Sequence, residues 1–236
     1  MRLILTRPEK DARPLADKLQ ALGHACIRVP LMEIVPREGA VVPAARYQAV
    51  CITSANGLAN PSLLAGLRDT KLLCVGPQSA AAATAAGFTD VTAAGGDVVG
   101  LTAYITSHLR PADGPLLYLS GAATSGDLEG RLQREGFGVA RVVSYDAVST
   151  TPDDLAKAVT SADAVLLYSP RTAKLWVEQI EKAKLAHHMA DMIHLCLSQA
   201  VANALPESWP RRVAHTPDEA AMLAVLEGLE PSNEQE

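Results

Sequence analysis

Six short turns in the sequence combine hydroxyl side chains, glycine and backbone amide groups, and they are the segments best suited to bind a ligand. Each turn follows a short apolar segment and precedes a segment of helical pattern. A helix start leaves several backbone N–H groups without partners and carries about half a positive charge, so these turns favour carboxylates or phosphates. The candidate binding residues are Thr6, Arg7, Ser54, Ala55, Asn56, Gly76, Ser79, Ser120, Gly121, Ser169, Pro170, Arg171 and Ser198.

Each hydroxyl group in these turns also has a simpler interpretation, which is that it caps a helix. For any one of them, capping is the better explanation. Several such turns facing one cleft would instead form a surface for an anion with many charges. Arg7 and Arg171 add to this second interpretation, because a cation at a helix start is mildly unfavourable and suggests a function there.

Tyr145 is the candidate catalytic residue. It ends an apolar segment, RVVSYDAV. Its phenol is protonated at neutral pH and can donate a hydrogen bond to an oxygen leaving group. The alternative is a tyrosine that packs at a domain edge with its hydroxyl group in water, and the residues alone do not choose between the two.

The elements that must position these residues occur twice. The segment from Leu3 to Ile34 is echoed by the segment from Leu117 to Val148, and AVCITSANGLA near Ser54 recurs as AVLLYSPRTAK near Ser169. The chain therefore reads as a duplicated α/β unit. Two similar lobes form a cleft, and clefts between lobes are common ligand sites.

Short, continuous apolar strands alternate with helical segments, which is typical of parallel sheets covered on both faces. Ligands of such sheets bind outside the carboxyl ends of the strands, where all six turns are expected. We expect strands at 2–5, 25–29, 49–53, 71–75, 164–168 and 193–197, with helices between them, including one directly after SANG.

Two pairings of the repeated segments are compatible with the sequence. In one, the halves lie side by side and divide near residues 111–115. In the other, the middle segments form one lobe while the first and last form the second, with two parallel connections. Composition does not distinguish them.

Several functional classes are disfavoured. The net charge of −5 and the aromatic content of 4% argue against nucleic-acid binding, which usually needs a basic surface and stacking aromatic rings. No GxGxxG, P-loop or GxSxG motif follows a strand, which disfavours nucleotide cofactors and a serine hydrolase. We expect neither a cofactor nor a metal.

The remaining histidines and cysteines suggest no site. His187, His188 and His194 form the single histidine cluster, and we expect a solvated surface there, because no further ligands stand at metal-binding spacing. The four cysteines are widely spaced and are expected to be free thiols. Without a signal peptide or an apolar segment of about 20 residues, we expect a soluble cytoplasmic protein with no membrane contact.

The ordered set of motifs resembles the uroporphyrinogen-III synthase family over nearly the whole chain. The motifs are LTRP, ITSANG, VGPQSA, LYLSG, GFGV followed by VxSYDA, LLYSP, and CLSQAVANAL. Each is short, but their order and spacing match the family.

The resemblance implies a fold and an activity. The fold is two Rossmann-like or flavodoxin-like lobes with parallel sheets, joined by two crossing segments. The implied lobes are 1–35 plus 150–236, and 40–146, with linkers at 36–43 and 147–154. The implied activity is the cyclisation of hydroxymethylbilane, a linear tetrapyrrole polycarboxylate, to uroporphyrinogen III, with inversion of the last ring and loss of water. The implied enzyme needs no metal or organic cofactor. Separately, we expect a monomer, because no long exposed apolar helix requires a partner.

The resemblance also assigns roles. Tyr145 matches the tyrosine that helps the terminal hydroxyl group leave, and Ser54, Ser79 and Ser169 match turn hydroxyls that hold the substrate. Ala55 replaces a frequent proline, and Val201 replaces a threonine near the substrate, a role that Ser198 could fill. The competing hypothesis is a non-catalytic two-lobed binding protein or sensor for an anionic small molecule.

Overall fold

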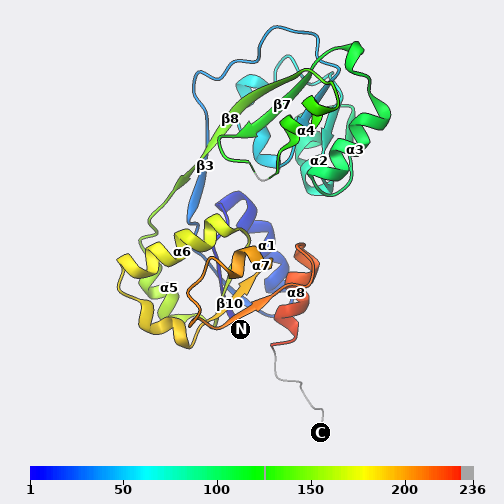
Figure 1. Ribbon diagram of the computed structural model, residues 1–236. Coiled ribbons are helices and arrows are strands. Elements are labelled where there is room, and N and C mark those ends of the chain that lie inside the picture. Colours follow the sequence, from blue (N-terminus) through cyan, green and yellow to red (C-terminus); the bar gives the residue numbers. More distant parts are fainter. Residues whose placement is uncertain (125, 230–236) are drawn as a thin grey trace. The chain divides into compact units, whose positions relative to one another are not determined.

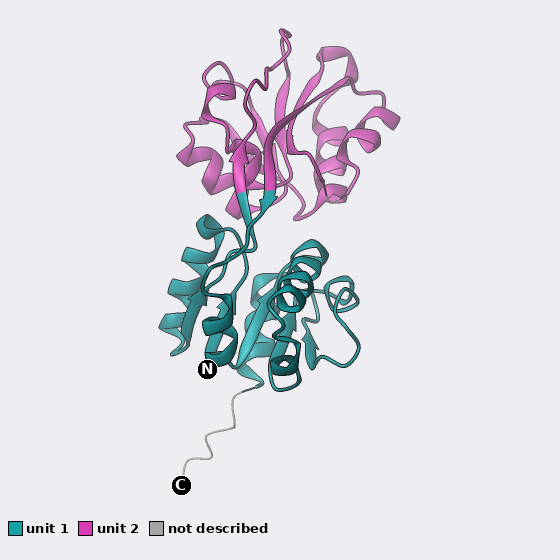
Figure 2. Cartoon of the chain, turned by 90° about the vertical axis from the view of Figure 1, so that its left-hand side faces the viewer, with its two compact units in different colours: residues 1–33, 148–236 teal, residues 34–147 magenta. Residues whose placement is uncertain are grey.

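A computed structural model describes residues 1–124 and 126–229, and the chain divides into two α/β units (Figure 1). Unit 1 comprises Met1–Glu33 and Val148–Glu236, and unit 2 comprises Ile34–Ala147 (Figure 2). The chain is thus interleaved, because unit 1 is built from both ends of the sequence. The two units have mostly parallel sheets, which confirms the predicted fold class.

The sheet of unit 1 has the strand order β11-β10-β9-β1-β2, and all neighbours in it are parallel. Its strands are β1 (Arg2–Leu5), β2 (Ala25–Arg28), β9 (Ala164–Leu167), β10 (Ile193–Cys196) and β11 (Arg211–Val213). Its helices are α1 (Glu9–Ala21), α5 (Leu155–Ser161), α6 (Pro170–Lys182), η4 (Ala186–Ala190), α7 (Gln199–Ala202) and α8 (Glu219–Glu227).

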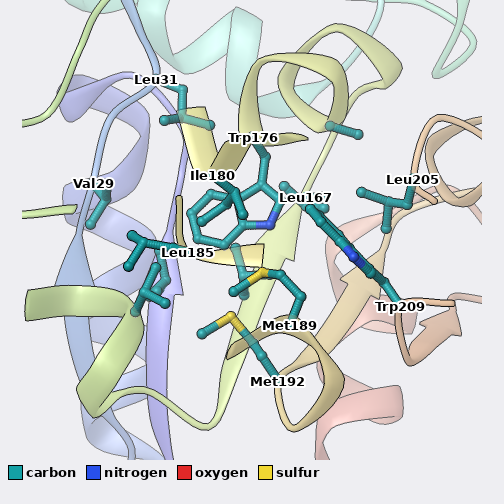
Figure 3. Packing of buried hydrophobic residues seen from close by; sticks show 14 of the residues in the cluster. Val29, Leu31, Leu167, Trp176, Ile180, Leu185, Met189, Met192, Leu205 and Trp209 are labelled. Atoms are coloured by element: carbon teal, nitrogen blue, oxygen red, sulfur yellow. The ribbon is translucent and has the colours of Figure 1, made fainter. Parts of the chain in front are cut away.

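Helices cover both faces of this sheet. Leu3 and Leu5 of β1 pack with residues of α1 and α8, whereas Ile4 packs with residues of α5 and α6. Successive residues of a strand point to opposite faces, so the continuous apolar run of β1 fills two cores. Figure 3 shows the core on the α5 and α6 side, which is built around Trp176 and Ile180.

The sheet of unit 2 has the strand order β3-β8-β7-β4-β5-β6, and the five strands from β8 to β6 run parallel to their neighbours. The strands are β3 (Met32–Pro36), β4 (Ala49–Ile52), β5 (Leu72–Cys74), β6 (Val91–Ala93), β7 (Leu116–Gly121) and β8 (Val139–Ser149). The helices are η1 (Ala55–Leu58), η2 (Pro61–Leu63), α2 (Pro77–Ala85), α3 (Val98–His108), η3 (Pro111–Asp113) and α4 (Leu128–Arg134).

Strands β3 and β8 carry the chain between the units. The backbone N–H of Arg37 donates to the carbonyl of Ser144 at 2.9 Å, and that of Thr150 donates to the carbonyl of Leu31 at 3.0 Å. Because residue numbers rise along one strand as they fall along the other, β3 and β8 run antiparallel.

The predicted helix after SANG is wrong. The segment forms two short 3₁₀ turns instead, η1 and η2. Pro61 has no backbone N–H to continue a helix. The side chain of Asn60 accepts a hydrogen bond from the N–H of Ser62 and so starts a new turn.

Candidate active site

The carboxyl edge of the sheet in unit 2 brings four predicted site residues into one region. Strands β4 and β7 are parallel neighbours, and the chain leaves them in opposite directions, toward β5 and toward β8. Such a switch point is where ligands of open α/β sheets bind. Ser54 follows β4, Ser120 and Gly121 end β7, and Tyr145 lies in the adjacent strand β8.

Tyr145 lies directly against Gly121. The two residues are paired in the register of β7 and β8. A methyl group built on Gly121 would lie 2.7 Å from Cζ and 2.9 Å from the hydroxyl oxygen of Tyr145. The phenol therefore lies over the last residue of β7 because that residue has no side chain.

Arg141 fixes the end of β7. Its guanidinium donates hydrogen bonds to Oγ of Ser120 and to the carbonyl of Gly121, both at 2.9 Å, and to the carbonyl of Ala122 at 3.1 Å. It also lies 4.0 Å from Glu129. Ser120 is buried, so its hydroxyl group serves this local network.

Ser54 caps the turn that follows β4. Its Oγ accepts a hydrogen bond from the N–H of Asn56 at 3.2 Å. Ala55 and Asn56 are half-buried and form the start of η1. The simpler interpretation of Ser54 as a capping residue therefore agrees with the structure.

Gly76 and Ser79 belong to the neighbouring turn, after β5. Gly76 precedes α2 and Pro77 is the first helical residue, as expected for a helix start that needs no side-chain cap. Ser79 lies inside α2 and is buried, so it does not cap that helix.

Unit 1 has a second switch point, between β1 and β9. Thr6 follows β1, and its hydroxyl group donates to the carbonyl of Leu166 at 2.8 Å. Thr6 is completely buried, so its side chain ties β1 to β9. Among the predicted site residues, Ser79 and Ser120 are buried as well.

Arg7 and Tyr168 meet at this second edge. The guanidinium of Arg7 lies 4.8 Å from the ring centroid of Tyr168, and it is 3.7 Å from Glu219 and 3.9 Å from Asp11. The Tyr168 hydroxyl group is buried and has no hydrogen-bond partner among the described residues. Burial raises the pKa of Tyr168 above its ordinary value, so the phenol is protonated.

Ser169, Pro170 and Arg171 form the start of α6. The N–H of Thr172 donates to Oγ of Ser169 at 3.1 Å, and the two hydroxyl oxygens lie 2.8 Å apart. Pro170 is the first helical residue, and Arg171 is exposed on the first turn. Ser198 occupies the equivalent position before α7, but its side chain makes no capping hydrogen bond.

Sequence comparison decides the family. The profile described as uroporphyrinogen-III synthase HemD matches residues 13–224. This chain belongs to the uroporphyrinogen-III synthase family. The activity of the family is that of a cyclising lyase in haem biosynthesis, and nothing in the comparisons supports the alternative of a non-catalytic sensor.

Solved structures of uroporphyrinogen-III synthases have the same fold. The uroporphyrinogen-III synthetase from Helicobacter pylori 26695 aligns with a TM-score of 0.65 at 15% identity, covering 98% of this chain and 100% of that one. A mutant uroporphyrinogen III synthase from Thermus thermophilus aligns with a TM-score of 0.51 at 16% identity, over 97% and 98% of the two chains. No curated protein sequence matches this chain.

Next to the predicted site residues, the structure of this uroporphyrinogen-III synthase family member places three residues that the sequence interpretation did not name, which are Ser144, Arg141 and Tyr168. Two of them carried a signal. Ser144 directly follows two valines in its strand, and Tyr168 ends an apolar run directly before a candidate turn. Nothing in the sequence pointed to Arg141, because its hydrogen-bond partners depend on how β8 pairs with β7.

The prediction of a solvated histidine cluster was wrong for His194. This residue is completely buried, and its ring stacks on Trp209 at 5.1 Å between centroids and lies edge-on to Trp176 at 6.4 Å. Burial lowers the pKa of His194 from 6.5 to about 4, so the ring is neutral. Figure 3 shows the two tryptophans in this core.

The described residues contain neither a metal-binding cluster nor a membrane-spanning helix. Within residues 1–124 and 126–229, no group of three or more His, Cys, Asp or Glu side chains is arranged to hold a metal ion. None of the helices in these ranges has the length and apolar character needed to cross a bilayer.

Proposed function

We propose that this member of the family closes hydroxymethylbilane to uroporphyrinogen III with loss of water, and that Tyr145 assists the departure of the terminal hydroxyl group. The observation that carries the role of Tyr145 is its position against Gly121, at the switch point of unit 2. There the phenol lies over the last residue of β7, at the edge of the sheet where ligands bind.

The chemistry requires little beyond a hydrogen-bond donor. The C–O bond of the terminal hydroxymethyl group breaks with its electron pair going to oxygen, while the pyrrole nitrogen supplies electrons to the exocyclic carbon. The oxygen takes up one proton from solvent and leaves as water, and the pyrrole N–H gives one proton to solvent, so that a neutral azafulvene remains. A phenol that donates a hydrogen bond to this oxygen stabilises the charge that develops on it, and it supplies that help without a metal or a cofactor.

The proposed binding groups for the substrate carboxylates are backbone amides and hydroxyl groups at the two carboxyl edges. In unit 2 they are in the turns at Ser54–Asn56, Gly76–Ser79 and Ser120–Gly121. In unit 1 they are at Thr6–Arg7, Ser169–Arg171 and Ser198. The starts of α2 and α6 support this assignment, because a helix start is an anion site by its own charge distribution. For Thr6 and Ser120 the proposed binding groups are in the backbone, since both hydroxyl groups already make hydrogen bonds within the protein.

Holding a flexible linear substrate is also the proposed basis of selectivity. Spontaneous closure of hydroxymethylbilane does not invert the last ring. An enzyme that fixes several carboxylates at once makes the inverted closure faster by orientation. We further propose a monomer in the cytoplasm, and light scattering coupled to size-exclusion chromatography tests the first of these two points.

The test of the reaction is an isomer assay. The purified protein is incubated with freshly prepared hydroxymethylbilane, and the products are oxidised and separated by chromatography. The expected result is a product dominated by isomer III. A mixture identical to that of a protein-free control contradicts the proposed activity.

A further inference from the structure

Strand β8 contains an extra residue next to Tyr145. Ser120 of β7 pairs with Val143, and the next residue, Gly121, pairs with Tyr145. Strand β8 therefore advances by two residues while β7 advances by one, and Ser144 is the residue of the bulge. Bulges bend a strand and redirect the side chains that follow, and they are common beside active sites. Without this bulge, Gly121 would oppose Ser144 and not Tyr145.

The bulge is held in place by the side chain of Ser144. Ser144 is completely buried, and its hydroxyl oxygen lies 2.8 Å from the carbonyl oxygen of Gly57 and 3.3 Å from that of Ser120. The single O–H therefore donates chiefly to Gly57. On its backbone side, the carbonyl of Ser144 accepts a hydrogen bond from the N–H of Arg37 at 2.9 Å.

The partner of this hydroxyl group, Gly57, is itself placed closely against β7. A methyl group on Gly57 would lie 2.8 Å from the carbonyl oxygen of Leu119, so the turn can pack here only with glycine. Ser144 thus joins three segments that come together at the switch point. They are the turn that begins with Ser54, the end of β7, and the part of β8 that carries Tyr145.

We propose that Ser144 is a positioning residue for the reaction. Its hydroxyl group fixes the bulge, the bulge places the phenol of Tyr145 over Gly121, and the same hydrogen bond holds the Ser54 turn at a set distance from that phenol. This inference rests on the proposed role of Tyr145. Its consequence is that losing the Ser144 hydroxyl group impairs turnover through Tyr145.

The kinetic test is a double-mutant cycle between Ser144→Ala and Tyr145→Phe, with kcat and KM measured for each variant. We expect Ser144→Ala to lower kcat by about tenfold to a hundredfold, the loss typical of a misplaced group, with a smaller change in KM. In the Tyr145→Phe background, the same substitution should lower kcat by less than about twofold. An equal loss in both backgrounds overturns the inference. Ser144→Thr, which retains a hydroxyl group, should recover most of the rate.

A spectroscopic test works without turnover and separates this inference from the role of Tyr145. The chain has five tyrosines, so labelling with 3-fluorotyrosine gives a small set of ¹⁹F resonances, and Tyr145→Phe identifies the one to follow. We expect Ser144→Ala to shift or split the Tyr145 resonance and to leave that of Tyr104 unchanged. Ser144→Cys keeps nearly the volume of the serine side chain, but its thiol is a weaker hydrogen-bond donor. We expect it to shift or split the Tyr145 resonance as well, and it replaces Ser144→Ala in this test if the alanine variant does not fold.

The matched control is Ser107→Ala. Ser107 is an exposed serine of the same unit, and its hydroxyl group also donates to a backbone carbonyl, that of Ala103 at 2.9 Å. It should change neither the Tyr145 resonance nor kcat. An unchanged Tyr145 resonance in the Ser144 variants overturns the inference. A shifted resonance together with full activity of Tyr145→Phe would show that Ser144 positions the ring, but it would contradict the proposed role of Tyr145 in the reaction and therefore any role of Ser144 in turnover.

Discussion

The ring of Tyr145 occupies the space that a side chain at position 121 would fill. A Cβ on Gly121 would lie within 2.9 Å of two ring carbons and the hydroxyl oxygen of Tyr145, closer than such contacts occur in proteins. Strand β7 therefore ends in glycine at the position where the tyrosine of β8 crosses it. The pairing of a small residue with a large one makes the place of the phenol sensitive to a single methyl group.

Gly121→Ala should consequently displace Tyr145 and lower kcat by about tenfold or more, because a catalytic group moved by about an ångström loses much of its effect. Steady-state kinetics and circular dichroism check this. Gly66→Ala is the control, since Gly66 lies in unit 2 with open space around its Cα and an ordinary backbone conformation. Equal activity of the Gly121 and Gly66 variants would show that the Tyr145 ring position does not matter.

Charge at the start of α6 should distinguish substrate binding from capping at Ser169. Asn and Asp cap helices about as well as Ser, so Ser169→Asn and Ser169→Asp should both keep the melting temperature within a few degrees. Only the aspartate adds a negative charge where we propose that a carboxylate binds. We expect KM to rise by about tenfold for Ser169→Asp and by much less for Ser169→Asn. If the two variants have the same KM, Ser169 only caps the helix.

Acid should destabilise unit 1 through His194. The ring binds a proton with a pKa of about 4 in the folded chain and 6.5 as its ordinary value, so between these pH values the unfolded chain binds more protons. The free energy of unfolding should therefore be insensitive to His194 above pH 6.5. It should fall as the pH is lowered toward 4, by about 3 kcal/mol in all.

Tryptophan fluorescence can follow this transition, because Trp176 and Trp209 both pack against His194 and are the two tryptophans of the chain. Urea unfolding at pH 5 and at pH 7 gives the change in the free energy of unfolding between these two pH values. His194→Gln, which cannot titrate, should be less stable at pH 7 but should lose less stability between pH 7 and 5. The same loss in the variant and in the parent would assign the acid sensitivity to other groups.

Much of the fold could be predicted because the strands of a parallel sheet that is covered on both faces have continuous apolar sequences. Every residue of Ala49–Ile52 and of Ala164–Leu167 is buried, and each run ends in a polar turn. Because the sequence pattern occurs twice, the strands predicted in one copy supported those predicted in the other. The segment after Ser54 did not follow the pattern, because Asn60 and Pro61 stop the helix that the repeat implied.

The candidate site was only partly predictable. The turns at the carboxyl edges could be placed, since the ends of parallel strands meet at one edge of a sheet. The bulge at Ser144 could not, because it depends on how β8 pairs with a strand more than twenty residues earlier. The hydrogen bond from the Thr6 side chain to Leu166 could not be predicted either, because it depends on the pairing of β1 with the distant strand β9.

The most direct test of the account is the rate of ring closure by Tyr145→Phe, compared with Tyr104→Phe. Tyr104 lies on α3 of the same unit, away from the carboxyl-edge turns in sequence, and stacks on His108. We predict that Tyr145→Phe lowers kcat by about tenfold to a thousandfold with substrate binding preserved, while Tyr104→Phe keeps the parental rate. A Tyr145→Phe enzyme that produces isomer III at the parental rate would contradict the central claim.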